Sequence, residues 1–198
     1  MKLILASQSS SRRAMLSAAG IPYDAMASAV DEEAAKAALK REGIEARGLA
    51  DALAELKSLK LSTRHPTDLV LGCDQVLVLA DGSLLDKPKD RDEAGAQLRQ
   101  MRGSVIRLIS AAVISEGGTP VWRHVDVARL TMRPFSEGFL SLYLDSEWPA
   151  ISGCVGCFRL EGLGVQLFSR IEGSHFTILG LPFIPLLDYL RTRGVVAS

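Results

Sequence analysis

The sequence has few cysteines, few aromatic residues and no excess of either charge. Three cysteines among 198 residues are too few for a disulfide framework, so a reducing cytoplasm is the default location. The 23 Lys and Arg residues are balanced by 23 Asp and Glu residues, which argues against nucleic acid as a partner. There is also no apolar run long enough to cross a bilayer and no signal-peptide pattern. We therefore expect a cytoplasmic protein that binds neither membrane nor nucleic acid.

Hydrophobic residues make up 47% of the chain and charged residues 23%, which is typical of a soluble globular protein. Strand-like and helix-like segments alternate along it. The expected strands are 2–6, 69–79, 105–114, 121–132 and 162–171, and the expected helices are 10–19, 31–61 with a break near Gly43, 90–101, 136–144 and 182–193. This order predicts an α/β fold with a mixed central sheet flanked by helices, in two lobes around a cleft.

A serine-rich turn with two arginines follows the first strand. Serines at a helix start offer capping oxygens, and the free N–H groups and helix dipole there favour an anion. Arg12 and Arg13 add planar groups with several donors, which suit phosphate. The turn therefore suggests a phosphorylated ligand, although by itself ordinary helix capping with solvated charge explains it better.

Asp74 lies inside an apolar strand, where a carboxylate is costly unless it is paired, hydrogen-bonded or bound to a metal. The alternative is a strand-end aspartate that caps a neighbouring helix. We favour a functional role because residues 31–33 (Asp-Glu-Glu) can supply a second carboxylate, and such oxygens suit Mg²⁺ or Mn²⁺. Lys87, in a loop stiffened by Pro88, adds a cation, whereas Lys89 is expected to face solvent.

Cys154 and Cys157 form a C-x-x-C motif, which is typical of redox or zinc sites. A zinc site needs more ligands than this chain offers, and a thioredoxin-type motif should begin a helix. Two buried small residues are the better explanation. His65 and His124 are isolated, and His175, in an expected loop, is at most a weak candidate for ligand contact.

Four separated segments resemble the Maf family of nucleotide pyrophosphatases. They are LILASQSSSRRAML at the start, VDE at 30–32, LGCDQVLVL followed by DKPKD, and LEGLGVQLFSRIEG followed by LGLP. The resemblance covers nearly the whole chain in the right order, so it implies a single Maf-type domain over residues 1–198. It also implies an α/β fold with a nucleotide-binding cleft.

The activity that this resemblance implies is hydrolysis of a nucleoside triphosphate to the monophosphate and pyrophosphate. Such enzymes use a divalent metal, Mg²⁺ or Mn²⁺, and act on non-standard or modified nucleotides. The nucleoside triphosphate is then the expected partner, and a homodimer is compatible with the resemblance.

The resemblance also assigns roles to individual residues. Asp74 matches the catalytic aspartate, and Glu32 matches a metal-associated glutamate, so Glu32 and Asp74 are the expected metal ligands. The residues that match phosphate-binding positions are Ser7, Ser9, Arg12, Lys57 and Lys87. The glutamate that precedes the family's lysine is Leu56 here, which leaves the match at Lys57 incomplete.

Ser11, Gln75 and Glu161 match positions that select the base. The Asp-Gln pair and the glutamate resemble the branch that hydrolyses 7-methyl-GTP, and a carboxylate suits the positive charge of the methylated ring. That branch usually has tryptophan where this chain has Ser11, and losing such an aromatic platform removes stacking worth roughly 1–3 kcal/mol per base. The preferred base stays open.

Two readings compete with a pyrophosphatase. One is a nucleotide-binding regulator of septum formation and cell division with little hydrolysis, which would not require the set of Asp74, Glu32 and Lys87. The other is a redox protein built on the C-x-x-C motif, which would lose its activity on replacement of Cys157 by serine.

Overall fold

The computed structural model describes residues 1–197, and strands and helices alternate along them as the sequence predicts. The strands are β1 (Leu3–Leu5), β2 (Asp24–Ala25), β3 (Leu69–Val78), β4 (Leu84–Leu85), β5 (Val105–Glu116), β6 (Thr119–Met132) and β7 (Phe168–Glu172). The α-helices are α1 (Ser10–Ala18), α2 (Glu32–Arg41), α3 (Ala46–Ser62), α4 (Arg91–Met101), α5 (Glu137–Glu147), α6 (His175–Ile178) and α7 (Phe183–Thr192), with a short 3-10 helix, η1, at Leu163–Leu167.

The strands form one mixed sheet in the order β2-β1-β3-β5-β6-β7, with β4 paired to β3. β1 is parallel to both β2 and β3, whereas β3–β4 and β6–β7 are antiparallel. β5 and β6 are joined by Gly117 and Gly118, whose φ angles of +56° and +79° suit a tight hairpin turn. The predicted α/β class with a mixed sheet flanked by helices is therefore confirmed.

The chain divides into two compact units. The first consists of residues 1–75, 109–126 and the described residues from His175 on, and the second consists of residues 76–108 and 127–174. No helix among the described residues is long and apolar enough to span a membrane.

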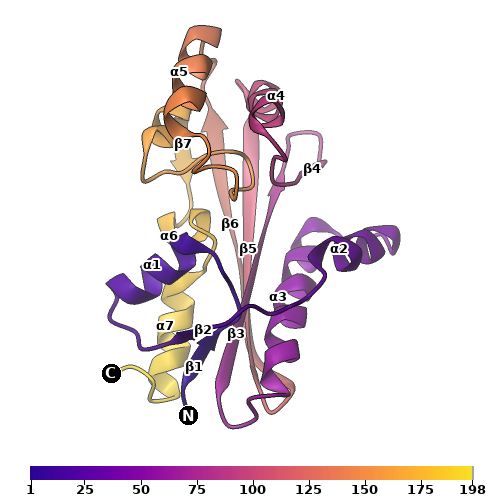
Figure 1. Ribbon diagram of the computed structural model, residues 1–198, viewed down its shortest axis with the longest axis vertical. Helices are drawn as coiled ribbons and strands as arrows, with labels where there is room; N and C mark the ends of the chain where they lie inside the picture. The colour runs from indigo at the N-terminus through magenta and orange to yellow at the C-terminus, as the bar shows by residue number, and fades with distance from the viewer. Residues whose placement is uncertain (198) are drawn as a thin grey trace. The chain divides into compact units, whose positions relative to one another are not determined.

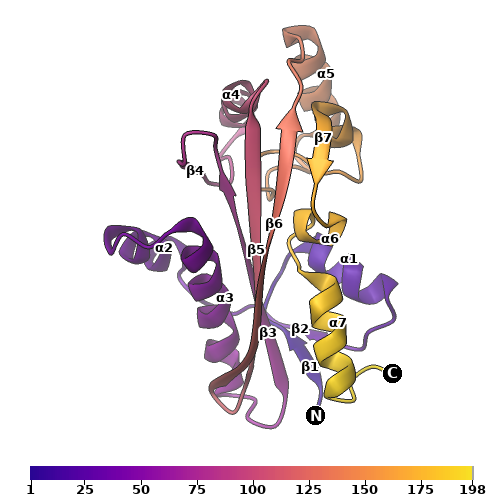
Figure 2. The same ribbon diagram turned by 180° about the vertical axis from the view of Figure 1, so that it is seen from behind.

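The first unit buries both faces of its strands. Side chains alternate along β1, so Leu3 and Leu5 join one cluster while Ile4 and Ala6 join the other. The first cluster includes apolar residues of α1 and α7, and the second includes Leu61 of α3. Figures 1 and 2 show α1 and α7 on one side of β1 and β3, and α3 on the other.

Gly72 allows α3 to pack directly against β3. A Cβ added at Gly72 would lie 2.1 Å from the backbone oxygen of Ala54 and 2.7 Å from the backbone nitrogen of Ser58. Only glycine permits this approach, because both neighbours are backbone atoms of the helix. The Ser58 hydroxyl also lies 2.7 Å from that of Ser115, which ties α3 to β5.

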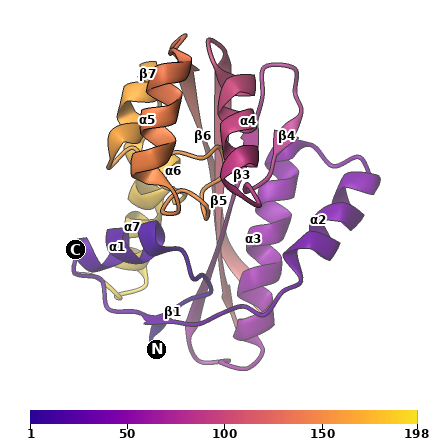
Figure 3. The same ribbon diagram turned by 45° about the horizontal axis from the view of Figure 1, so that its top comes forward.

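In the second unit, α4 and α5 lie against the strands, side by side in Figure 3. Asp90 and Ser136, the first residues of the two helices expected here, cap them by accepting from the backbone N–H groups of Glu93 and Phe139. Arg99 of α4 and Arg102, which directly follows this helix, donate to the Glu137 carboxylate of α5.

Two local expectations are wrong. The segment 162–171 was expected to be a strand, but its first part is η1, because Gly164 packs so tightly on residue 159 that an added Cβ would lie 2.3 Å from the Arg159 oxygen. His175 begins α6 and is not in a loop.

Candidate active site

Lys57 joins two of the predicted carboxylates. Its Nζ atom lies 2.7 Å from Asp74 Oδ1 and 2.9 Å from Glu32 Oε2. The Lys57 side chain is 7% exposed and that of Asp74 11%, whereas that of Glu32 is 50% exposed. The cluster therefore opens to solvent on the Glu32 side, and the leucine at position 56 does not remove Lys57 from it.

Arg12 is buried beside the same stretch of β3, but its partners are neutral. Its Nε donates to the Gly180 carbonyl at 2.8 Å, and its Nη1 donates to the Cys73 carbonyl at 3.1 Å and to the Ser7 hydroxyl at 3.2 Å. Among the described residues no carboxylate pairs with this guanidinium. A buried cation with neutral partners is suited to receive an anion.

Local sequence places these groups. Ser9 caps α1 by accepting from the Arg12 backbone N–H, and Ser7 accepts from the Ser9 backbone N–H. Asp31 caps α2 by accepting from the Ala34 N–H, which puts Glu32 in the first turn of that helix. The predicted capping role of the serines is therefore present together with the buried arginine.

The Cys73 thiol lies on the apolar side of β3, close to both cations. Burial raises its pKa to about 11, while the positive charges of Arg12 and Lys57 lower it and the Asp74 charge raises it. The thiol is therefore protonated at neutral pH, and Cys73 contributes to this site through its backbone carbonyl.

The other predicted residues of the first unit lie close to this cluster in sequence. Ser11 is on α1, next to Arg12, and is partly exposed. Gln75 follows Asp74 on β3, and its amide nitrogen donates to the Ser110 hydroxyl and to the carbonyls of Thr177 and Ile178.

Lys87 and Glu161 belong to the second compact unit, where both are exposed. Each influences the Cys154 thiol, whose pKa is raised by burial and then by Glu161, and lowered by Arg159 and Lys87. Glu147 holds the segment before and after Glu161 by accepting from Arg159 at 2.8 Å and from the Leu163 N–H at 3.1 Å.

The C-x-x-C motif forms a turn in which the Cys157 N–H donates to the Cys154 carbonyl at 3.2 Å. Both thiols are free, and Cys157 is buried. Burial raises the pKa of Cys157 to about 12, and its thiol donates to Gln97 Oε1. A protonated thiol is a poor nucleophile and a poor metal ligand, so these contacts favour a structural role.

The carboxylates fit one kind of metal site. Among residues 1–197, no three His, Cys, Asp or Glu side chains are grouped to hold an ion. Glu32 and Asp74 remain, each contacting Lys57 through one of its two oxygens. Mg²⁺ is commonly bound by one or two carboxylates together with waters and substrate phosphates, so this donor pair fits such an ion.

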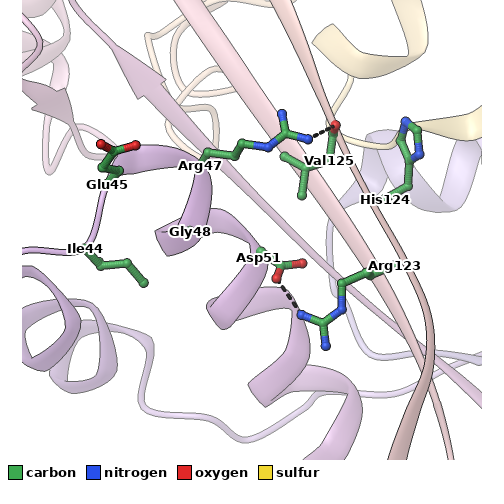
Figure 4. A pocket seen from close by; sticks show the side chains of 8 residues that line it. All are labelled: Ile44, Glu45, Arg47, Gly48, Asp51, Arg123, His124 and Val125. Atoms are coloured by element: carbon green, nitrogen blue, oxygen red, sulfur yellow. Dashed lines mark hydrogen bonds and ion pairs between the residues drawn. The ribbon is translucent and has the colours of Figure 1, made fainter.

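A hollow of about 570 Å³ lies elsewhere in the first unit, between the start of α3 and β6 (Figure 4). Arg47 donates to the Val125 carbonyl across it, and Arg123 donates to Asp51 Oδ2. The other oxygen of Asp51 is buried with no hydrogen-bond partner in the described part of the chain. None of the predicted site residues lines this hollow, which is formed by Ile44, Glu45, Arg47, Gly48, Asp51, Arg123, His124 and Val125.

Sequence reasoning missed the residues that support the site. Gly72 lets α3 bring Lys57 to Asp74, and the carbonyl of Gly180 holds Arg12. A glycine inside an apolar strand is a signal of close backbone approach that could have found Gly72. The contacts of Ser110 and Thr177 with Gln75 have no such local signal, because they join residues 35 and 102 positions apart.

Comparison with known proteins gives a consistent result. A family model described as "Maf-like protein" matches residues 2–193. A protein of Sphingopyxis alaskensis named "Nucleoside triphosphate pyrophosphatase" is 48% identical over 195 residues, covering 98% of each chain. A protein of Ruegeria pomeroyi with the same name is 50% identical over 194 residues, covering 98% of this chain and 97% of that one.

A solved structure of a HAM1 protein from Coxiella burnetii matches with a TM-score of 0.44 and 13% identity, over 68% of this chain and 74% of that chain. A likeness at this level says nothing of function.

Proposed function

This chain belongs to the Maf-like protein family, and on that premise we propose that it hydrolyses nucleoside triphosphates to the monophosphate and pyrophosphate. The observation that carries the proposal is the buried Asp74–Lys57 pair next to Arg12, a cation with only neutral partners. The arrangement supplies a carboxylate base beside an anion site, and the names of the relatives agree with that chemistry.

Asp74 is the general base of the proposed reaction. Lys57 orients the carboxylate by donating to its Oδ1, and the carboxylate accepts a proton from the attacking water. The water oxygen forms a bond to the α-phosphorus as the bond between the α-phosphorus and the bridging oxygen breaks. The electron pair leaves with pyrophosphate, and the proton stays on Asp74 until solvent removes it.

Arg12 binds the triphosphate. The Gly180 and Cys73 carbonyls and the Ser7 hydroxyl orient its guanidinium, so its charge is held in place before substrate arrives. Ser9 contributes by capping α1 through the backbone N–H of Arg12, which fixes where the helix begins. The phosphate role of Lys87 rests on the sequence resemblance alone.

A divalent cation is part of the proposal. Glu32 and Asp74 would hold Mg²⁺ or Mn²⁺, and the ion supplies charge neutralisation for the triphosphate when it is bound. Lys57 pairs with both carboxylates and so holds them next to each other.

The proposed substrates are nucleotides with modified bases, and 7-methyl-GTP is the first to test. The exposed carboxylate of Glu161 suits a positively charged base, and Ser11, partly exposed beside Arg12 on α1, is a small side chain. The relatives' names specify no base, so the preferred base is identified by testing a panel of nucleotides.

The test is to incubate the protein with 7-methyl-GTP, GTP, dTTP, UTP and modified pyrimidine triphosphates in Mg²⁺ or Mn²⁺, and to assay pyrophosphate and orthophosphate separately. Pyrophosphate as the primary product is expected, with activity lost on chelation and restored by the metal. Orthophosphate as the primary product would indicate another phosphatase. Binding without release of either product would favour the regulator of cell division.

A further inference from the structure

The carbonyl that holds Arg12 belongs to a glycine at the end of α6. Gly180 has a φ of +95°, and its N–H donates to the Thr177 carbonyl while the next N–H, of Leu181, donates to Phe176. This pair of bonds is a Schellman motif, which needs a left-handed residue after the helix. The motif turns the Gly180 carbonyl toward Arg12 Nε, 2.8 Å away.

The space at this position is also tight. A Cβ added at Gly180 would lie 3.3 Å from both Nε and Nη2 of Arg12. The guanidinium therefore rests directly on the backbone of residue 180, and any displacement of that backbone moves Arg12.

The Thr177 carbonyl determines where this turn lies. It accepts from the Gly180 N–H at 3.1 Å, from the Ser110 hydroxyl at 2.7 Å and from Gln75 Nε2 at 3.0 Å. The Thr177 hydroxyl is also bonded, to Asp126 Oδ2 at 2.6 Å. The short helix is thus attached to β3, β5 and β6 through one residue.

The direction of the Gln75 amide follows from chemistry. Nε2 lies 3.0 Å from the Thr177 carbonyl and 3.1 Å from the Ile178 carbonyl. Both carbonyls can only accept hydrogen bonds, so the nitrogen and not the oxygen of the amide faces them. The donors of Gln75 are therefore committed to groups of the protein itself, namely these two carbonyls and the Ser110 hydroxyl.

We propose that Gln75 is a positioning residue for Arg12. It holds the Thr177 and Ile178 carbonyls, these hold the turn at Gly180, and the Gly180 carbonyl orients the guanidinium that grips phosphate. Gln75 then serves every nucleotide alike, in contrast to the base-selecting role that the resemblance implies for it. The inference rests on the proposed function in treating Arg12 as the phosphate ligand.

The test measures phosphate binding apart from turnover and base choice. Inorganic triphosphate is titrated into the wild type and into Gln75→Leu by calorimetry, and kcat and KM are measured for two nucleotides with different bases. We expect triphosphate binding to weaken about tenfold in Gln75→Leu, as for loss of one bond to an ordering partner. The ratio of kcat/KM between the two nucleotides should stay as in the wild type.

A matched pair at Thr177 tests a second contact that holds the same turn. Thr177→Val removes the hydroxyl that Asp126 holds and keeps the shape, so we expect it to weaken triphosphate binding. Thr177→Ser keeps the hydroxyl and should restore it. Should Gln75→Leu prove unfolded by circular dichroism, Gln75→Met, which keeps the length of the side chain but has no donor for the two carbonyls, is measured in its place.

Coupling to Arg12 completes the experiment. In an Arg12→Ala background, Gln75→Leu should cause no further loss of triphosphate binding, because the group that it positions is absent. Additive losses would overturn the proposal, as would unchanged triphosphate binding with an altered ratio between nucleotides. Wild-type protein that binds triphosphate but releases no pyrophosphate from any nucleotide contradicts the proposed function only, and the binding measurements still test Gln75.

Discussion

Arg12 and Lys57 are two buried cations that meet β3 at successive residues, yet their surroundings differ. Arg12 contacts the Cys73 carbonyl and other neutral oxygens, whereas Lys57 contacts the Asp74 carboxylate and Glu32. The charge of Lys57 is compensated within the protein, and that of Arg12 is not. The difference indicates which cation serves a ligand and which serves the protein's own carboxylates.

Burial of a charge without a counter-charge costs free energy, so the Arg12 arrangement is not one that stability alone would favour. Its hydrogen bonds recover part of the cost by satisfying Nε and Nη1. An anionic ligand would supply the missing negative charge. Lys57 needs no such ligand, because two carboxylates lie within 3 Å of it.

The largest expected effect comes from the carboxylate that Lys57 holds. Asp74→Asn keeps the shape and an acceptor for Lys57 but removes the base, so pyrophosphate release should fall by about 10²–10⁴-fold. Pyrophosphate release is measured alongside a thermal melt by circular dichroism. Full activity in this variant would remove Asp74 from the mechanism.

The next largest effect is expected on stability, where loss of Lys57 should cost more than loss of Arg12. Lys57→Met leaves Asp74 and Glu32 facing each other without a cation, so it should lower the free energy of unfolding by about 3 kcal/mol. Arg12→Met removes a charge that no carboxylate compensates, so it should cost only about 1 kcal/mol through its three acceptors. Urea unfolding of both variants gives the comparison.

The control for this pair is Arg191→Ala, which breaks an exposed ion pair with Asp188 on α7. We expect it to change the free energy of unfolding by less than about 1 kcal/mol. Equal losses in Lys57→Met and Arg12→Met would mean that the two cations are compensated alike, contrary to the geometry.

Binding of triphosphate should depend on the shape of the Arg12 side chain as well as on its charge. Arg12→Lys retains a positive charge but cannot reproduce the planar fork, so inorganic triphosphate should bind about tenfold more weakly. The measurement is the rise in melting temperature with added triphosphate, compared with the wild type. An unchanged rise would show that charge alone, without the fork, is sufficient.

The smallest effect is expected in the second unit. Cys157→Ser should leave pyrophosphate release unchanged, because the thiol is a structural donor to Gln97. Loss of activity in this variant would favour the redox interpretation and contradict a site built on Arg12 and Lys57 alone.

The same variant should alter the alkaline stability. Burial raises the Cys157 pKa to about 12, above the value of about 8.5 for an unfolded thiol. The stabilising contribution of the protonated thiol is therefore complete below about pH 8.5 and is lost as the pH rises toward 12. Serine does not ionise in that range. Between pH 8 and pH 10.5, the free energy of unfolding measured in urea should therefore fall less in Cys157→Ser than in the wild type.

Much of the fold follows from local sequence. Ser9, Asp90 and Ser136 cap helices that begin within one residue of the expected positions, and the Gly117-Gly118 turn joins two strands. These features depend on residues a few positions apart, so a sequence pattern records them. The first part of the strand expected at 162–171 is wrong, since β7 begins only at Phe168, and the contact of Gly164 with Arg159 in that part is one that periodicity does not express.

The sequence by itself determined the family, the order of strands and helices, and the residue types that the chemistry needs. Only the tertiary structure decided how each charge is compensated. Lys57 reaches Asp74 because Gly72 admits the backbone of α3, and Arg12 is oriented by the carbonyl of Gly180, 168 residues away. A charge acts on whatever lies within a few ångströms, and in a folded chain those neighbours are set by packing and not by sequence order.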